Sequence, residues 1–217
     1  MNEDFDFNVK KKRPEESYER VIDYFKGKTL YRYARSKSLM KIQEKLTIRA
    51  LELLNLKKRD SIILDAGCGP GFTSIYLKEI GYNVIALDII SDFLYFYDVK
   101  DLNPIVADMC FPPFQSNSFD GIISISALQW IFKDINSELM RNNLINLMKS
   151  FERILRPNSK AIFQFFPKNK LIMDEIGKVI TNNSDLKGRY VIDNPNSAKK
   201  RKIFLFLKKG NGRNFQY

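Results

Sequence analysis

The sequence predicts an α/β fold in which a mostly parallel sheet is covered by helices on both faces. Two observations carry this prediction. Short apolar runs of strand length alternate with segments whose apolar residues recur at helical spacing. Two of these runs end directly before an acidic residue, at Asp65 and Asp88. Alternating strands and helices imply parallel strands joined by crossovers, so ligands should bind beyond the carboxyl ends of the strands.

The elements follow in chain order. One helix is predicted from Pro14 to about Gly27, and a longer one from Lys37 to Leu56, because their apolar residues share one helical face. The remaining helices are predicted at 73–80, 91–99, 138–155 and 170–181. The strands are predicted at 61–64, 83–87, 104–106, 121–125, 160–165 and 202–207, with a loop from 126 to 130.

The length of 217 residues favours a single domain. Residues 1–13 are expected to form a flexible arm, because polar and charged side chains dominate them. The domain itself would span 14–217, with a helical lid at 14–56 and the core at 57–217. Neither a secretory signal nor an apolar run of membrane-spanning length is visible, so a cytoplasmic protein is expected.

Composition excludes several kinds of chemistry. The chain has no histidine and two cysteines, which excludes histidine-based triads, imidazole zinc sites and a disulfide framework. Its formal net charge of +11 favours a polyanionic partner such as RNA. Well-solvated, lysine-rich surfaces would explain the same surplus.

The strongest local signal is the segment Leu64-Asp65-Ala66-Gly67-Cys68-Gly69-Pro70-Gly71, between a predicted strand and a predicted helix. Asp88 ends the next strand, where a carboxylate can bind ribose hydroxyls. Asp65 would repel the pyrophosphate of a dinucleotide but would attract the sulfonium and ammonium groups of S-adenosylmethionine. The loop therefore predicts a Rossmann-like site for S-adenosylmethionine rather than for NAD; a structural turn capped by an acid is the alternative.

The third strand adds Asp108 and Met109. Asp108 can accept the adenine amino group while the next backbone N–H meets a ring nitrogen, or it can simply cap the loop. Cys68 and Cys110 are interpreted as small residues beside the cofactor, because no base or cationic partner suggests a nucleophile.

The loop after the fourth strand should face the methyl acceptor. Its sequence, Ser124-Ile125-Ser126-Ala127-Leu128-Gln129-Trp130, lacks the Asn-Pro-Pro-Tyr pattern that holds a planar amino group. Trp130 can stack on a base or belong to the core. After the fifth strand, Gln164-Phe165-Phe166-Pro167-Lys168-Asn169 brings further aromatics to the same rim, and at least one of Phe165 and Phe166 is expected in the core. The predicted target-facing residues are Ser126, Gln129, Trp130, Phe166 and Pro167.

A reaction at guanine N7 suits a chain without histidine. That nitrogen carries an available lone pair, so it can attack the methyl group in line without losing a proton. The protein then needs only to position the reactants and exclude water.

At this point the sequence resembles the small-subunit ribosomal RNA guanine-N7 methyltransferases, which are class I S-adenosylmethionine-dependent enzymes of ribosome biogenesis. The resemblance runs from Arg13 over nearly the whole chain. It includes Arg13-Pro14-Glu15, and its most specific segments are Arg49-Ala50-Leu51-Glu52-Leu53-Leu54, Ser124-Ile125-Ser126-Ala127-Leu128-Gln129-Trp130 and Phe166-Pro167-Lys168-Asn169.

The resemblance implies roles for particular residues. Tyr33 and Arg35 would close over the methionine end of S-adenosylmethionine. The full cofactor-binding set is expected to be Tyr33, Arg35, Asp65, Gly67, Cys68, Gly69, Asp88, Ile89, Asp108, Met109 and Ser124. No residue is expected to act as an acid or base, and no metal site is expected.

The resemblance also implies partners. These are ribosomal RNA, in a precursor of the small subunit, and a small zinc-containing activator protein. The aromatic run from Phe93 to Tyr97 could contact that activator or cover the sheet. Because eukaryotic members carry a lysine-rich C-terminal tail, a sequence ending at Tyr217 suggests a compact prokaryotic or archaeal relative. A small-molecule methyltransferase and an RNA-binding assembly factor with dispensable methyl transfer are the alternative functions.

Overall fold

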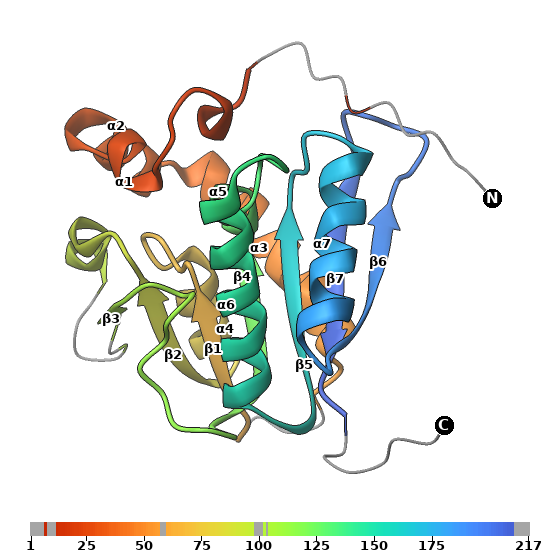
Figure 1. Ribbon diagram of the computed structural model, residues 1–217. Coiled ribbons are helices and arrows are strands. Elements are labelled where there is room, and N and C mark those ends of the chain that lie inside the picture. Colours follow the sequence, from red (N-terminus) through yellow and green to blue (C-terminus); the bar gives the residue numbers. More distant parts are fainter. Residues whose placement is uncertain (1–6, 8–11, 57–59, 98–101, 103, 211–217) are drawn as a thin grey trace, which may run out of the picture.

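A computed structural model describes residues 7, 12–56, 60–97, 102 and 104–210. Figure 1 shows a sheet with helices on both of its faces. Within the described residues the sheet has seven strands in the order β3-β2-β1-β4-β5-β7-β6. The strands are β1 (Ile62–Ala66), β2 (Asn83–Asp88), β3 (Ile105–Val106), β4 (Phe119–Ile125), β5 (Leu155–Phe165), β6 (Lys187–Asp193) and β7 (Lys202–Lys208).

Strands β1 to β5 pair in parallel, and β7 lies antiparallel between β5 and β6. The helices are α1 (Val21–Tyr24), α2 (Gly27–Ala34), α3 (Lys37–Leu54), α4 (Phe72–Glu79), α5 (Leu128–Ile131), α6 (Glu138–Ile154) and α7 (Lys170–Asn183). Two 3-10 turns, η1 (Pro14–Glu16) and η2 (Ser91–Phe96), complete the described elements. The predicted fold class is therefore confirmed.

The core consists of two apolar layers, because successive strand residues point to opposite faces. Leu64 and Ile122 join the layer formed with α6 and α7, whereas their neighbours Ile63 and Ile123 join the layer formed with α3. In Figure 1, α6 and α7 lie in front of the sheet and α3 lies behind it. This explains why the buried parts of β1, β4 and β5 are mostly apolar on both faces.

The predicted helix from Pro14 to Gly27 is wrong. The segment instead forms η1 and α1, and a separate α2 begins at Gly27. The backbone is extended at Arg20 and at Lys26, which interrupts a continuous helix. Its apolar side chains pack instead around the buried Leu30 and Phe93.

Smaller differences concern the irregular segments. The predicted loop at 126–130 contains the short helix α5, and β5 begins at Leu155 rather than at Lys160. Residues 91–96 form a 3-10 turn rather than an α-helix, and 98–99 lie outside the described residues. Strand β6 is not among the predicted elements; it is an edge strand whose first three residues are exposed.

The ends of the predicted domains are only partly described. Of the arm at 1–13, only Phe7, Lys12 and Arg13 belong to the described residues. Arg13 is docked rather than free, because its guanidinium donates to the carbonyl of Phe166 at 2.8 Å. None of the described helices is both long and apolar enough to cross a membrane.

Candidate active site

Two adjoining cavities lie at the carboxyl ends of the parallel strands. The first, here called the glycine-loop cavity, has a volume of about 300 Å³ and is lined by Gly67 and Gly69 after β1, Asp88 at the end of β2, and Asp108 and Met109 after β3. The second, here called the aromatic cavity, has a volume of about 580 Å³. Their position is the one that an open parallel sheet provides for ligands.

The glycine loop has a backbone that other residues would strain. Gly67 and Gly69 have φ angles of +75° and +53°. A Cβ atom on Gly67 would lie 2.6 Å from the Cβ of Ala127, whereas a Cβ on Gly69 would meet no atom within 4 Å. The loop is fixed below by the amides of Gly67 and Cys68, which donate to the carbonyl of Leu87 at 2.8 and 3.0 Å. It leaves open room above Gly69 for a ligand.

Two buried carboxyl groups lie close to this loop. Asp88 accepts hydrogen bonds from the amides of Gly69 at 2.7 Å and Ile90 at 2.8 Å. Burial raises its pKa to about 6. Asp65 accepts a hydrogen bond of 2.5 Å from the Ser74 hydroxyl, and burial raises its pKa to about 7. Burial thus disfavours the ionised form of both carboxyl groups, and a cationic ligand close to them would stabilise that form.

The structure brings together most of the predicted cofactor-binding residues. Those lining the glycine-loop cavity are Tyr33, Gly67, Gly69, Asp88, Ile89, Asp108 and Met109. Burial raises the pKa of Tyr33 to about 12, so its hydroxyl stays protonated at neutral pH. Asp108 also accepts a 2.8 Å hydrogen bond from the Cys110 amide, so it caps its loop as well as facing the cavity.

Four of the residues predicted to bind the cofactor do not line this cavity. Asp65 points to Ser74 of α4, and Ser124 is fully buried within the sheet. Cys68 packs in a small apolar cluster with Tyr97. Arg35 is exposed, with its guanidinium 5.8 Å from the ring centre of Tyr31.

Sequence reasoning also missed part of the cavity wall. Val21, Ile22 and Phe25 of the N-terminal segment line the cavity together with Phe93 of η2. Their apolar character was visible, but it was interpreted as the face of one helix. Because that helix is broken, these side chains close over the strand ends instead.

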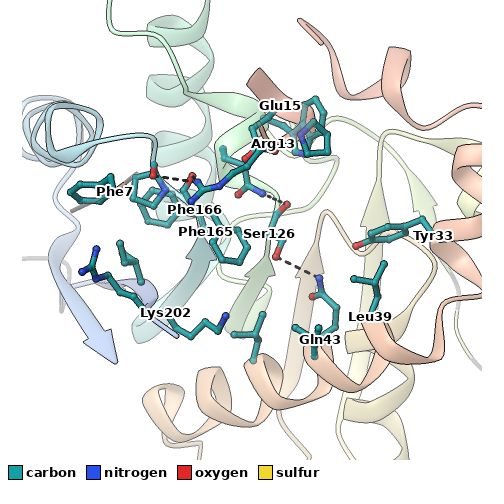
Figure 2. A pocket seen from close by; sticks show the side chains of 18 of the residues that line it. Phe7, Arg13, Glu15, Tyr33, Leu39, Gln43, Ser126, Phe165, Phe166 and Lys202 are labelled. Atoms are coloured by element: carbon teal, nitrogen blue, oxygen red, sulfur yellow. Dashed lines mark hydrogen bonds between the residues drawn. The ribbon is translucent and has the colours of Figure 1, made fainter. Parts of the chain in front are cut away.

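The aromatic cavity contains every residue predicted to face the target. Ser126, Gln129, Trp130, Phe166 and Pro167 all line it. Figure 2 shows Ser126 near its centre, with Phe165 and Phe166 on one side and Tyr33 on the other. Phe165 is fully buried, which confirms that one of the two phenylalanines belongs to the core. Trp130 is half-buried and stacks on Tyr24, with ring centres 5.9 Å apart. It lines the cavity as well.

Ser126 is held by a network of side chains. Its backbone has a φ of +59°. Its hydroxyl donates to Gln164 Oε1 at 3.0 Å and accepts from Gln43 Nε2 at 3.5 Å. Its carbonyl accepts from Gln129 Nε2 at 2.9 Å. The loop after β4 is therefore fixed from three directions.

The two cavities share one wall. Phe25, Tyr33, Ser126 and Trp130 line both of them. A group bound in one cavity would thus face a group bound in the other across these four side chains. This is the arrangement that a transfer between two bound molecules requires.

The rim of the aromatic cavity is basic. Arg13, Lys199, Arg201 and Lys202 line it, against a single acidic residue, Glu15, in the described wall. The Lys202 ammonium lies 5.6 Å from the ring centre of Phe166. This combination suits a nucleic acid, because basic side chains can bind its phosphates and aromatic side chains can stack on its bases.

Comparison with known proteins defines the class. Residues 64–163 match the methyltransferase domain family. Solved structures with this fold include a geranyl diphosphate C-methyltransferase from Streptomyces coelicolor (TM-score 0.60, 11% identity, 78% of this chain and 77% of that one). An N-methyltransferase from Bradyrhizobium japonicum matches with TM-score 0.59 and 15% identity over 83% of this chain and 96% of that one. The chain is an S-adenosylmethionine-dependent methyltransferase.

Curated relatives narrow the class to a family. The 18S rRNA (guanine-N(7))-methyltransferase of Mus musculus is 34% identical over 92% of this chain and 72% of its own length. The 18S rRNA (guanine(1575)-N(7))-methyltransferase of Saccharomyces cerevisiae is 35% identical over 85% of this chain and 68% of its own. The chain belongs to the 18S rRNA guanine-N7 methyltransferase family.

Proposed function

We propose that this protein methylates guanine N7 in the RNA of the small ribosomal subunit. The observation that carries the proposal is the shared wall of Phe25, Tyr33, Ser126 and Trp130 between the two cavities. One cavity has the glycine loop and the carboxyl groups that suit S-adenosylmethionine. The other has the aromatic wall and basic rim that suit a nucleotide. The names of the curated relatives support the same acceptor.

Residues of the glycine-loop cavity would hold the cofactor. Asp88 would accept hydrogen bonds from the ribose hydroxyls, with lone pairs not used by Gly69 and Ile90. Asp108 and Met109 would receive the adenine, and Tyr33 would cover the methionine end. S-adenosylmethionine, when bound, supplies an electrophilic methyl group. Asp65 would act only through its charge, because its side chain points away from the cavity.

The residues of the aromatic cavity would position the acceptor. The chain has no histidine, and guanine N7 requires no base because it loses no proton in the transfer. Ser126 is fixed by Gln43, Gln164 and Gln129, so it offers a rigid edge beside the base. Trp130 and Phe166 offer ring faces for stacking. Catalysis would then come from orientation and from exclusion of water.

The basic rim favours RNA over a small neutral acceptor. Four cationic residues surround an aromatic cavity of about 580 Å³. A small-molecule methyltransferase, the first alternative, would need no such rim. A ribosome-assembly factor with dispensable transfer would not need two cavities that share a wall. An assembly role alongside catalysis is compatible with both features.

The small zinc-containing activator is also a proposal. The edge of the sheet next to Asp88 has exposed apolar residues that such a partner could cover. Tyr95 is 86% exposed, and Val106 on the edge strand β3 is 53% exposed. Tyr31 packs edge-on against Phe96, with ring centres 5.6 Å apart.

We expect the protein to act where small subunits are assembled, in the cytoplasm.

The direct test is methyl transfer to RNA. The protein would be incubated with radiolabelled S-adenosylmethionine and small-subunit RNA or precursor particles, and the product nucleosides would be separated. We expect label in 7-methylguanosine at one position, with activity increased by an activator if one is required. Label confined to a free metabolite, or to another nucleoside, would contradict the proposal.

A further inference from the structure

Glu15 is the one acidic residue among those described in the wall of the aromatic cavity, which has four basic residues. It belongs to η1, is 7% exposed and lines the aromatic cavity. Its position is fixed by its neighbour Arg13, which donates to the carbonyls of Phe166 at 2.8 Å and Pro167 at 3.4 Å. Figure 2 shows Glu15 beside Arg13 on the upper rim of this cavity. The next residue, Glu16, is exposed and lines neither cavity.

No side chain of the described residues donates a hydrogen bond to the Glu15 carboxylate or forms an ion pair with it. Burial raises its pKa, and a hydrogen bond from its own backbone amide and the positive charges of Arg13 and Lys133 oppose that effect. A buried carboxylate whose only donor is its own backbone amide keeps lone pairs unused, which is unfavourable unless a ligand provides further donors. Glu15 therefore marks a position in the cavity where N–H groups of a ligand would be stabilised.

Gln129 provides a second, independent indication. Its Nε2 donates to the carbonyl of Ser126 at 2.9 Å. Its Oε1 is buried and finds no donor among the described residues. The amide is thus oriented by the loop after β4 while its acceptor oxygen is unused. Two acceptor groups with unused hydrogen-bonding capacity therefore line the same cavity.

The donors that fit two acceptors are those of guanine. Its Watson–Crick edge presents N1–H and the exocyclic amino group, and adenine and cytosine have no such pair. N7 lies on the opposite side of the purine. Glu15 and Gln129 line the aromatic cavity but not the glycine-loop cavity. A guanine whose N1 edge faced Glu15 would therefore direct N7 toward the shared wall.

We propose that Glu15, together with Gln129 of the same cavity wall, selects guanine by accepting hydrogen bonds from N1–H and the exocyclic amino group. This inference rests on the proposed function, and it makes Glu15 a specificity-determining residue rather than a group that takes part in methyl transfer. Enclosed sites that read a base by such bonds reject analogues lacking them, because their polar groups are then left unpaired.

The test compares guanosine with inosine, which lacks only the exocyclic amino group. Two RNAs would carry guanosine or inosine at the position that the wild-type protein methylates. For the wild type we expect kcat/KM to be roughly 10- to 100-fold higher for guanosine, as for the loss of a hydrogen bond to a charged group. Glu15→Gln and Glu15→Ala should lower kcat/KM for guanosine by a similar factor and reduce the preference to about threefold or less.

Glu16→Gln is the matched control, because it removes the same charge from the neighbouring exposed residue. It should keep the wild-type preference. Thermal unfolding and S-adenosylmethionine binding would be measured for each variant, so that misfolding is detected. A Glu15 variant that remains folded and loses activity equally on both RNAs would overturn the proposal and leave Glu15 a structural role. No transfer to either RNA by the wild type would instead contradict the proposed function.

Discussion

At the residue scale, the buried carboxyl groups link cofactor affinity to pH. Burial raises the pKa of Asp88 to about 6 and that of Asp65 to about 7. Both groups are therefore largely protonated below pH 5; Asp88 is largely ionised above pH 7 and Asp65 above pH 8. A sulfonium near them favours the ionised forms, so its binding should release protons.

From this we expect S-adenosylmethionine to bind more tightly as pH rises from about 5.5 to about 7.5, by roughly tenfold if one such carboxyl dominates. Isothermal calorimetry in buffers of different ionisation enthalpy would measure both the affinity and the released protons. S-adenosylhomocysteine is the control, because it keeps the amino group but lacks the sulfonium charge and should show a weaker dependence. Asp88→Asn should weaken binding and flatten the pH profile; an unchanged profile would contradict the assignment.

Positions of site residues were predictable where a strand end fixes them. Asp88 and Asp108 follow strands of a parallel sheet, so they had to reach the same edge. The direction of Asp65 was not predicted, although it shares a face of the sheet with Ile63 and points to Ser74 of α4 rather than into the cavity. Glu15 had no such signal, because its role depends on a turn whose packing is decided by residues far along the chain, above all Phe166.

At the element scale, the glycine loop is the least tolerant connection. Gly67 combines a φ of +75° with a Cβ position 2.6 Å from Ala127. Gly177 in α7 has a Cβ position with no atom within 4 Å. The two glycines therefore form a matched pair for the same substitution.

Gly67→Ala should lower the free energy of unfolding by about 2 to 4 kcal/mol, from left-handed backbone strain and overpacking. It should also weaken cofactor binding, because the loop must shift away from Ala127. Gly177→Ala should raise stability by about 0.5 to 1 kcal/mol, because alanine is the better helix former. Urea denaturation with linear extrapolation measures both changes. Equal effects of the two substitutions would show that the loop geometry is not restrictive.

The long elements were predictable and the short ones were not. Helices α3 and α6 repeat their apolar face over several turns and each begins with a serine cap, at Ser36 and Ser137. Strand β6 and the segment from η1 to α2 have no such repetition. Their conformation depends on what they pack against: β7 for β6, and η2 for the N-terminal segment.

At the scale of the whole molecule, the β6–β7 hairpin has positive charges at both of its ends, and only one end lies next to the aromatic cavity. The β6–β7 hairpin turns through residues 194–201 at the carboxyl end of the sheet, beside Phe165 of β5. There the exposed Lys199 and Lys200 precede Arg201, which donates to the Pro195 carbonyl at 2.7 Å. The other end of the same hairpin has Lys187 paired with Lys208. One hairpin thus presents lysines both at the cavity and far from it.

This arrangement allows the effect of charge beside the cavity on RNA binding to be distinguished from the effect of the net charge of the chain, which is +11. Lys199→Ala with Lys200→Ala should weaken RNA binding and lower the slope of log Kd against log salt by about 1.4, since each phosphate contact to single-stranded RNA contributes about 0.7. Lys187→Ala with Lys208→Ala removes the same charge from the far end and should leave the slope nearly unchanged. Fluorescence anisotropy over roughly 50 to 300 mM KCl would compare the two pairs. If both pairs lowered the slope equally, RNA binding would follow net charge rather than the rim of the aromatic cavity, since only the first pair lies in the turn beside it.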